Sequence, residues 1–202
     1  MNGYRSAPRR RGDELVAAIF SATLTELENN GFAALSMEGV AARARVGKAS
    51  LYRRWGSKLE LVVNAVSTTF PDSDQLADTG SLRGDLVDNF TQVANVLAGP
   101  TGHAIRGFVG EALRDRSGSI DLRARSHGRG ARAMRVLVAR AVDRGELGAI
   151  ELTDQQAAVG HTLVRHQFLW QGEVTDTAIA AIVDEVVVPL LLSASGRPSP
   201  SA

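Results

Sequence analysis

The spacing of apolar and polar positions predicts helices along almost the whole chain. From residue 13 onward, apolar side chains recur every three or four positions, which is the period of one face of an α-helix. Asn30-Gly31 supplies a stop for this first helix. No segment alternates convincingly between apolar and polar residues as a strand does, and no fixed-period repeat is present. The chain is therefore predicted to be all-α.

Two short helices are expected directly after the first one. Ser36 can cap a helix that runs to about Ala44, because its hydroxyl can accept a hydrogen bond from the free amides of the first turn. A tight turn over residues 45–47 then leads into a helix over residues 48–55. Two short helices joined by such a turn have the pattern of a helix-turn-helix unit.

A fourth helix and a joint follow this unit. Ser57 and Glu60 have the spacing of a capping box, which opens a helix through about Thr69. Residues 71–80 are polar, acidic and rich in turn-forming residues, so they are predicted to connect two parts of the chain. Beyond this joint we expect helices over residues 81–98, 103–115, 119–144, 153–171 and 175–194.

These elements divide the 202 residues into five parts. They are a disordered basic arm, a DNA-binding domain in which a three-helix helix-turn-helix unit is followed by the fourth helix, the joint, a larger helical domain, and a disordered tail. A chain of this length can bury a core without covalent staples. The corresponding ranges are residues 1–12, 13–70, 71–80, 81–195 and 196–202.

The composition excludes several classes of protein. The chain has no cysteine, which rules out a disulfide scaffold, a thiolate metal site and a cysteine nucleophile. Its longest apolar stretch, residues 186–192, is far shorter than the roughly 20 residues that a membrane helix needs. The amino-terminal residues are rich in arginine but lack the apolar segment of a secretory signal. We therefore expect a soluble, cytoplasmic protein with no membrane partner.

Positive charge is concentrated near the start of the chain. Residues 1–70 hold ten Lys and Arg against six Asp and Glu, although the formal net charge of the whole chain is only +1. Residues 43–58 contain six basic residues and no acid. Such a run suits DNA, whose backbone carries one negative charge per about 1.7 Å of helix axis, and a helix fits the roughly 12 Å wide major groove. The pattern predicts a DNA-binding surface.

Residues 36–58 read SMEGVAARARVGKASLYRRWGSK and carry a resemblance to a known family. With the amphipathic helix before them, residues 13–70 resemble the DNA-binding domain of TetR-family transcription regulators. The remainder of the chain is similar to the family in length and helical character. The most specific part of the match is Leu51, Tyr52, Trp55, Ser57, Lys58 and Leu61.

The resemblance implies roles for individual residues in DNA binding. Ser36 would cap the second helix and touch a phosphate, and the first turn of the third helix would face base edges. Tyr52 and Lys58 would bind phosphates, whereas Leu51 and Trp55 would pack into the small core. A buried Tyr52 is the alternative. The full set of expected DNA contacts is Ser36, Arg43, Arg45, Lys48, Ala49, Ser50, Tyr52, Arg53, Arg54 and Lys58.

The chain departs from the usual pattern of the family inside the turn. The family usually has a glycine where this chain has Arg45, at a position that needs a positive φ. A side chain there is expected to cost on the order of 1 kcal/mol. Gly47 replaces the usual hydroxyl cap, and Ala49 replaces a frequent glycine.

The carboxy-terminal domain has no motif that fixes a ligand site. The segment over residues 153–171 mixes polar and aromatic side chains, which suits either the wall of a pocket or a subunit interface. The resemblance implies that the last two helices form a four-helix bundle with the partner subunit. The candidate effector-pocket residues are Phe90, Phe108, His161, Arg165, Phe168 and Trp170. The candidate dimer contacts are Ile179, Ile182, Val183, Val186, Val187 and Leu190.

Two weaker patterns are interpreted as structural. His161 and His166 are five residues apart, so they do not share a helix face as a zinc pair would, and no metal or other cofactor is expected. Gly128 and Gly130 match a dinucleotide fingerprint by letter, but no strand precedes them. We expect a flexible or kinked stretch at this point.

The leading interpretation is a homodimeric transcription regulator that acts as a repressor and that a small-molecule effector releases from a palindromic operator. The alternative is a ligand-sensing or protein-interaction module with weak DNA binding. An all-α enzyme is disfavoured, because no nucleophile–base pair and no paired carboxylates are evident.

Overall fold

The computed structural model describes residues 12–112 and 116–196 of the chain. The predicted amino-terminal arm, apart from residue 12, and the tail beyond residue 196 lie outside this range. The described residues form helices and turns, as predicted. In order, the elements are α1 (Gly12–Ala34), α2 (Met37–Ala44), α3 (Lys48–Tyr52), α4 (Lys58–Ser67), η1 (Ser73–Gln75), α5 (Leu82–Ala98), α6 (Pro100–Ala112), α7 (Arg116–Asp143), α8 (Asp154–Gln171), α9 (Asp176–Ala181), the π-helical turn η2 (Ile182–Val187) and α10 (Val188–Ser195).

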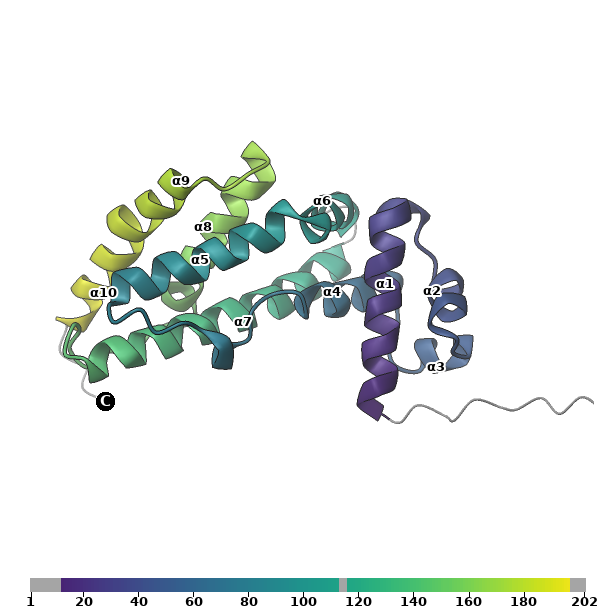
Figure 1. Ribbon diagram of the computed structural model, residues 1–202, viewed down its shortest axis with the longest axis horizontal. Coiled ribbons are helices and arrows are strands. Elements are labelled where there is room, and N and C mark those ends of the chain that lie inside the picture. The colour runs from purple at the N-terminus through teal and green to yellow at the C-terminus, as the bar shows by residue number, and fades with distance from the viewer. Residues whose placement is uncertain (1–11, 113–115, 197–202) are drawn as a thin grey trace, which may run out of the picture.

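The helices form an elongated molecule with two cores. Helices α2 and α3 lie against α1 at one end, and α4 leads from them toward the bundle formed by α5 to α10 (Figure 1). The first core lies among the four helices α1, α2, α3 and α4. Its fully buried side chains are Ile19, Val40, Leu51, Leu61 and Val62. The second core fills the bundle. Because α1 also packs against α6, the two parts are in direct contact.

Several helix boundaries differ from the sequence prediction. The first helix is interrupted at Gly31, as expected, where φ of 71° breaks the helical geometry before one further turn. The third helix ends at Tyr52 rather than Trp55, because the chain tightens there and the amide of Arg54 bonds to the carbonyl of Leu51. The helix predicted over 103–115 begins earlier, at Pro100, which is favourable at a helix start because it lacks an amide hydrogen.

The expected kink near Gly128 and Gly130 was wrong. Helix α7 runs without interruption from Arg116 to Asp143. A Cβ atom at residue 130 would lie 2.7 Å from Cγ of His161, so the glycine permits close packing of α7 against α8. The missing side chain serves tertiary contact, which the local pattern does not reveal.

The last helix contains a widened turn. The amide of Val188 bonds to the carbonyl of Val183, five residues back, instead of the usual four. Pro189 follows at once, and its ring would clash with the carbonyl of residue 185 in a regular helix. The π-helical turn relieves this clash, and it shifts which side chains of the last helix face the bundle.

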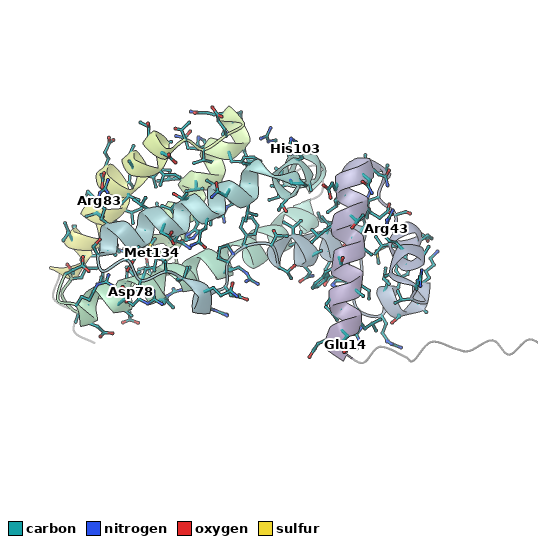
Figure 2. All side chains as sticks on the ribbon, in the orientation of Figure 1. Glu14, Arg43, Asp78, Arg83, His103 and Met134 are labelled. Carbon is teal, nitrogen blue, oxygen red and sulfur yellow. The ribbon has the colours of Figure 1, made fainter. Side chains whose placement is uncertain are left out.

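A cluster of ion pairs fixes the joint to the bundle. The carboxylate of Asp85 is fully buried and accepts hydrogen bonds from the amide and hydroxyl of Thr79, at 2.7 and 2.8 Å. Arg144, at the end of α7, donates to Asp85 at 2.9 Å and also to Asp78 and Glu146. Asp78 lies beside this end of α7 in Figure 2. We call Asp78, Thr79, Asp85, Arg144 and Glu146 the joint cluster.

One helical run among the described residues, Asp176–Ser195, is long and apolar enough to cross a membrane by length and composition alone. Its apolar side chains Ile179, Val183, Val187 and Leu191 are buried in the bundle core. On its other side, Asp184 forms a bidentate ion pair with Arg83 of α5, at 2.7 and 2.8 Å. Figure 2 shows Arg83 next to this helix. This helical run therefore packs one face into the bundle core and leaves the other face exposed.

Candidate nucleic-acid interface

The start of α2 is fixed by its own first residues. The Oγ atom of Ser36 accepts a hydrogen bond from the amide of Gly39 at 3.0 Å, so Ser36 is the N-cap that the sequence predicted. Leu35 before the cap and Val40 within the helix are both buried. The apolar pair and the hydroxyl together set the angle at which the chain enters α2.

The turn between α2 and α3 has the strained residue that the sequence indicated. Arg45 has φ of 56° and ψ of 47°, and no other described residue except glycine has a positive φ. The amide of Arg45 bonds to the carbonyl of Ala42, and the amide of Val46 bonds to the carbonyl of Ala41. These two bonds close the end of α2 in the manner usually completed by glycine. The turn thereby fixes the angle at which α3 follows α2.

Helix α3 is anchored by one face and exposed on the other. Leu51 is fully buried and Trp55 nearly so, and the rings of Trp55 and Phe20 pack with centroids 5.6 Å apart. Tyr52 is 46% exposed, which excludes the buried alternative for this residue. Lys48, Ala49, Arg53 and Arg54 are exposed and Ser50 is half-buried.

Two of the predicted DNA contacts already form ion pairs within the chain. Nε of Arg43 lies 2.6 Å from Oε1 of Glu26 on α1, and Arg43 is seen beside that helix in Figure 2. The ammonium group of Lys48 pairs with Glu38 and lies 5.6 Å from the centroid of the Tyr52 ring. The hydrogen bond from Lys48 lowers the pKa of Glu38, and the carboxylate of Glu38 raises the pKa of Lys48.

Lys58 is also engaged within the chain. Its ammonium group donates to the carbonyl of Phe32 at 3.0 Å and lies 4.4 Å from the centroid of the Phe32 ring. It thereby ties the start of α4 to the end of α1, and a phosphate would have to compete with these contacts. Ser57 caps α4 as predicted. In the predicted capping box the carboxylate of Glu60 would accept from the amide of Ser57, whereas in the structure it accepts from the amide of Gly56 at 2.8 Å.

The candidate pocket residues do not form one group in the structure. The rings of Phe90 and His161 meet edge to face with centroids 5.1 Å apart, and both side chains are buried. Phe168 is buried beneath the guanidinium of Arg106, which lies 4.3 Å from its ring centroid. Trp170 is 79% exposed at the end of α8, so it cannot line an interior pocket of this chain.

Of the two remaining pocket candidates, Arg165 and Phe108, the structure describes the side chain of Arg165. Arg165 is half-buried one turn after His161, and burial lowers the pKa of its guanidinium. The side chain of Phe108 lies outside the described part of the structure. A separate open groove of about 770 Å³ lies between the second half of α7 and residues 149–154, where no pocket residue was predicted.

The predicted dimer contacts require correction. The side chains of Ile179, Ile182, Val183 and Val187 are buried in the core of the chain's own bundle. Of that set, Val186 is exposed and Leu190 is half-buried. The exposed large apolar side chains of α8, η2 and α10 are Leu169, Trp170, Val186 and Leu192. The apolar stripe alone could not show which of its members face the inside of the bundle.

Two sequence-profile matches cover most of this architecture. The family described as "Bacterial regulatory proteins, tetR family" matches residues 19–65, which span α1 to α4. The family described as "Tetracyclin repressor-like, C-terminal domain" matches residues 76–186, more than half of the chain. The chain belongs to the TetR family. It is therefore a DNA-binding transcription regulator of a family whose members are not enzymes.

Individual relatives agree with this assignment. The TetR-family chain is 29% identical over 180 residues to an uncharacterised HTH-type transcriptional regulator of Mycobacterium tuberculosis, over 88% of each chain. It is 28% identical over 186 residues to a DNA-binding transcriptional repressor TetR of Mycobacteroides abscessus, covering 90% of this chain and 96% of the other. The crystal structure of a TetR family transcription regulator matches with a TM-score of 0.68 at 25% identity, covering 87% of this chain and 98% of the other.

Sequence reasoning missed the acidic partners of this TetR-family interface. Glu26 and Glu38 pair with Arg43 and Lys48, yet neither lies at a helical spacing from its partner that would have indicated the pair. Arg144 was likewise missed, because its contacts come from the joint, α5 and the loop after α7. Each of these pairs depends on how separate helices meet.

Proposed function

We propose that the protein is a homodimeric repressor that binds a palindromic operator and is released by a small-molecule effector. The observation that carries this proposal is the geometry of α3 and the turn after it, in which Leu51 and Trp55 are buried and Lys48, Tyr52 and Arg53 are exposed. A helix presented in this way can enter the major groove. Acting on DNA, the protein would work in the bacterial cytoplasm.

The proposed DNA contacts fall into two groups. Lys48, Ala49 and Ser50 would read base edges because they lie in the first turn of α3, and Arg53 because it is exposed directly after that helix. The remaining contacts would bind phosphates and fix the register of the protein on the duplex. These are Ser36, Arg43, Arg45, Tyr52, Arg54 and Lys58, of which Arg43 and Lys58 would exchange contacts within the chain for phosphate.

A dimer is supported by the exposed apolar side chains of the carboxy-terminal helices. Leu169, Trp170, Val186 and Leu192 are each at least 38% exposed. Burying them against a second copy of the chain would remove this apolar surface from water. A dimer would also present two α3 helices to successive major grooves, whose centres are about 34–36 Å apart.

Repression is supported by the named relative of Mycobacteroides abscessus, which is a transcriptional repressor and is similar to almost the whole chain. Release by an effector is supported by the extensive contact between the bundle and the DNA-binding helices, since α6 and α7 pack on α1 and α4. A ligand that binds two arrangements of these helices with different affinity would shift the equilibrium between them.

The proposal is tested by selecting bound duplexes from a random DNA library at near-physiological salt. The selected duplexes should share an inverted repeat. Analytical ultracentrifugation of the protein should give the mass of two chains. The variant Arg53→Ala should alter the selected bases, whereas Tyr52→Phe should weaken binding to all sequences alike. A folded dimer that selects no motif would contradict operator binding and favour the alternative of a ligand-sensing module.

A further inference from the structure

Two buried polar atoms in the bundle have no hydrogen-bond partner. They are Oδ1 of Asn89 on α5 and Nδ1 of His161 on α8. Both side chains are more than nine-tenths buried, and the two helices pack against each other. An unsatisfied buried polar atom destabilises a folded chain, and native proteins contain few of them. Two on neighbouring helices therefore indicate a partner that the chain itself does not supply.

The side chains against His161 are closely packed and mostly apolar, and the charged group near it is Arg165. The ring of Phe90 meets the imidazole edge to face at 5.1 Å, and Gly130 of α7 lies against its other atoms. Gly160 makes room in turn for the Phe90 ring, whose Cζ would be 2.4 Å from a Cβ at that position. Burial, and to a lesser degree the charge of Arg165, lowers the pKa of His161 to about 3. The imidazole is therefore neutral at physiological pH.

The chemistry of the two atoms restricts the partner. A neutral imidazole nitrogen accepts or donates a hydrogen bond according to its tautomer, and a side-chain amide presents oxygen or nitrogen according to its orientation. A hydroxyl group both donates and accepts, so it satisfies either arrangement. A charged group would lose its hydration among these apolar side chains.

We propose that Asn89 and His161 are the polar contacts of an effector site whose ligand is an uncharged, largely apolar molecule that carries a hydroxyl group. This inference rests on the proposed release of DNA by a small molecule, and it adds the chemistry of that molecule. The ring of Phe90, which meets the His161 imidazole at 5.1 Å, supplies an aromatic wall beside this histidine. The hydroxyl group fixes the orientation of the ligand within an otherwise apolar site.

The test uses pairs of probes in which a hydroxyl group is replaced by a methyl ether, which can accept but not donate a hydrogen bond. Isothermal titration calorimetry of the full-length chain without DNA compares 1-naphthol with 1-methoxynaphthalene, and cyclohexanol with methoxycyclohexane. At least one hydroxylated probe should bind about tenfold more tightly than its methylated counterpart, since the methyl ether leaves a buried atom unpaired. Equal affinity within both pairs, or no binding by any probe, would overturn the proposal.

Matched variants assign the preference to the two residues. In Asn89→Leu and His161→Phe, the ratio of the affinity for the hydroxylated probe to that for its methyl ether should fall toward one. The controls Asn95→Leu and His166→Phe replace exposed residues of the same two helices and should keep it. A preference that survives in both core variants would overturn the assignment. If either core variant fails to fold, the comparison of probe pairs on the unchanged chain still decides the chemistry.

A buried water molecule is the competing explanation for the two atoms. It predicts that no hydroxylated probe has an advantage, which is the overturning outcome above. Failure of the inference is also separable from failure of the proposed function. An operator recovered from random DNA, with no discrimination among the probes, would refute only the ligand chemistry. Discrimination among the probes without any selected DNA motif would refute only the operator.

Discussion

Arg144 is expected to be one of the most sensitive positions outside the two cores. In the joint cluster, its guanidinium lies 2.9 Å from Asp85, whose carboxylate is fully buried. The change Arg144→Met keeps much of the length of the side chain but removes the charge. Asp85 then keeps only the two hydrogen bonds from Thr79 among the contacts described here. The free energy of unfolding should therefore fall.

The magnitude follows from burial. Removing one partner of a buried ion pair typically costs about 3–5 kcal/mol, because the other charge stays buried without compensation. Arg144 is 23% exposed and Thr79 still donates to Asp85, so we expect a value of about 3 kcal/mol, at the lower end of that range. The pairs of Arg144 with the more exposed Asp78 and Glu146 add little. For a chain of this size the melting temperature should fall by roughly 6–12 °C.

Urea denaturation and thermal melting measure this loss, and α7 offers a matched control. Arg135 on the same helix pairs at 2.6 Å with Asp154, which is 95% exposed, so Arg135→Met should cost less than about 0.5 kcal/mol. The double variant Arg144→Met, Asp85→Asn should lose less than the sum of the single variants, because the two residues interact. Equal effects of the Arg144 and Arg135 changes would refute the reasoning.

Four further predictions concern other parts of the molecule. Burial opposes the charged form of Asp85, but hydrogen bonds from Thr79 and Arg144 outweigh it and lower the pKa of this carboxyl group. The stabilising contribution of Asp85 is therefore present above the unfolded pKa of about 3.9 and is lost as the pH falls through the folded pKa. Acid titration of the unfolding free energy should show a steeper loss for the unchanged chain than for Asp85→Asn. Arg45→Gly should raise stability by about 1 kcal/mol in urea denaturation, whereas Arg45→Ala, which keeps the Cβ atom in the left-handed turn, should not. Glu38→Gln should increase affinity for scrambled DNA and steepen its salt dependence in fluorescence anisotropy, because Lys48 loses its partner, and the same change at the exposed Glu28 should do so less. Trp170→Ser should weaken self-association in sedimentation equilibrium, and an unchanged dimer constant would place the interface elsewhere.

Much of the DNA-binding domain could be predicted from the sequence. The caps at Ser36 and Ser57, the left-handed turn at Arg45 and the buried positions of Leu51 and Trp55 all have local causes. A cap depends on a hydroxyl a few residues from an amide, and burial in a short helix depends on the spacing of its apolar residues. The predictions for these residues were confirmed. The DNA contacts themselves remain a proposal.

The helices of the bundle could be predicted from the sequence, but which of their faces are buried and which are exposed could not. The stripe around Ile179 and Val187 faces the chain's own core, because the π-helical turn before Pro189 and the pair between Arg83 and Asp184 set the orientation of the last helix. Apolar spacing specifies one face of a helix but not what covers it. Trp170 was predicted to line the pocket because residues 153–171 mix polar and aromatic side chains, but it lies on the outside of the chain.

The helical class, the helix-turn-helix and the resemblance to the family could be recognised from the order of residues alone, because periodicity, caps and short motifs act over a few residues. Which charges are paired depends instead on how the helices pack. Glu38 meets Lys48, Arg144 meets Asp85, and Gly130 admits His161, through contacts between separate helices. The unpaired atoms of Asn89 and His161 became evident in the same way, since burial without a partner is a property of the packed bundle.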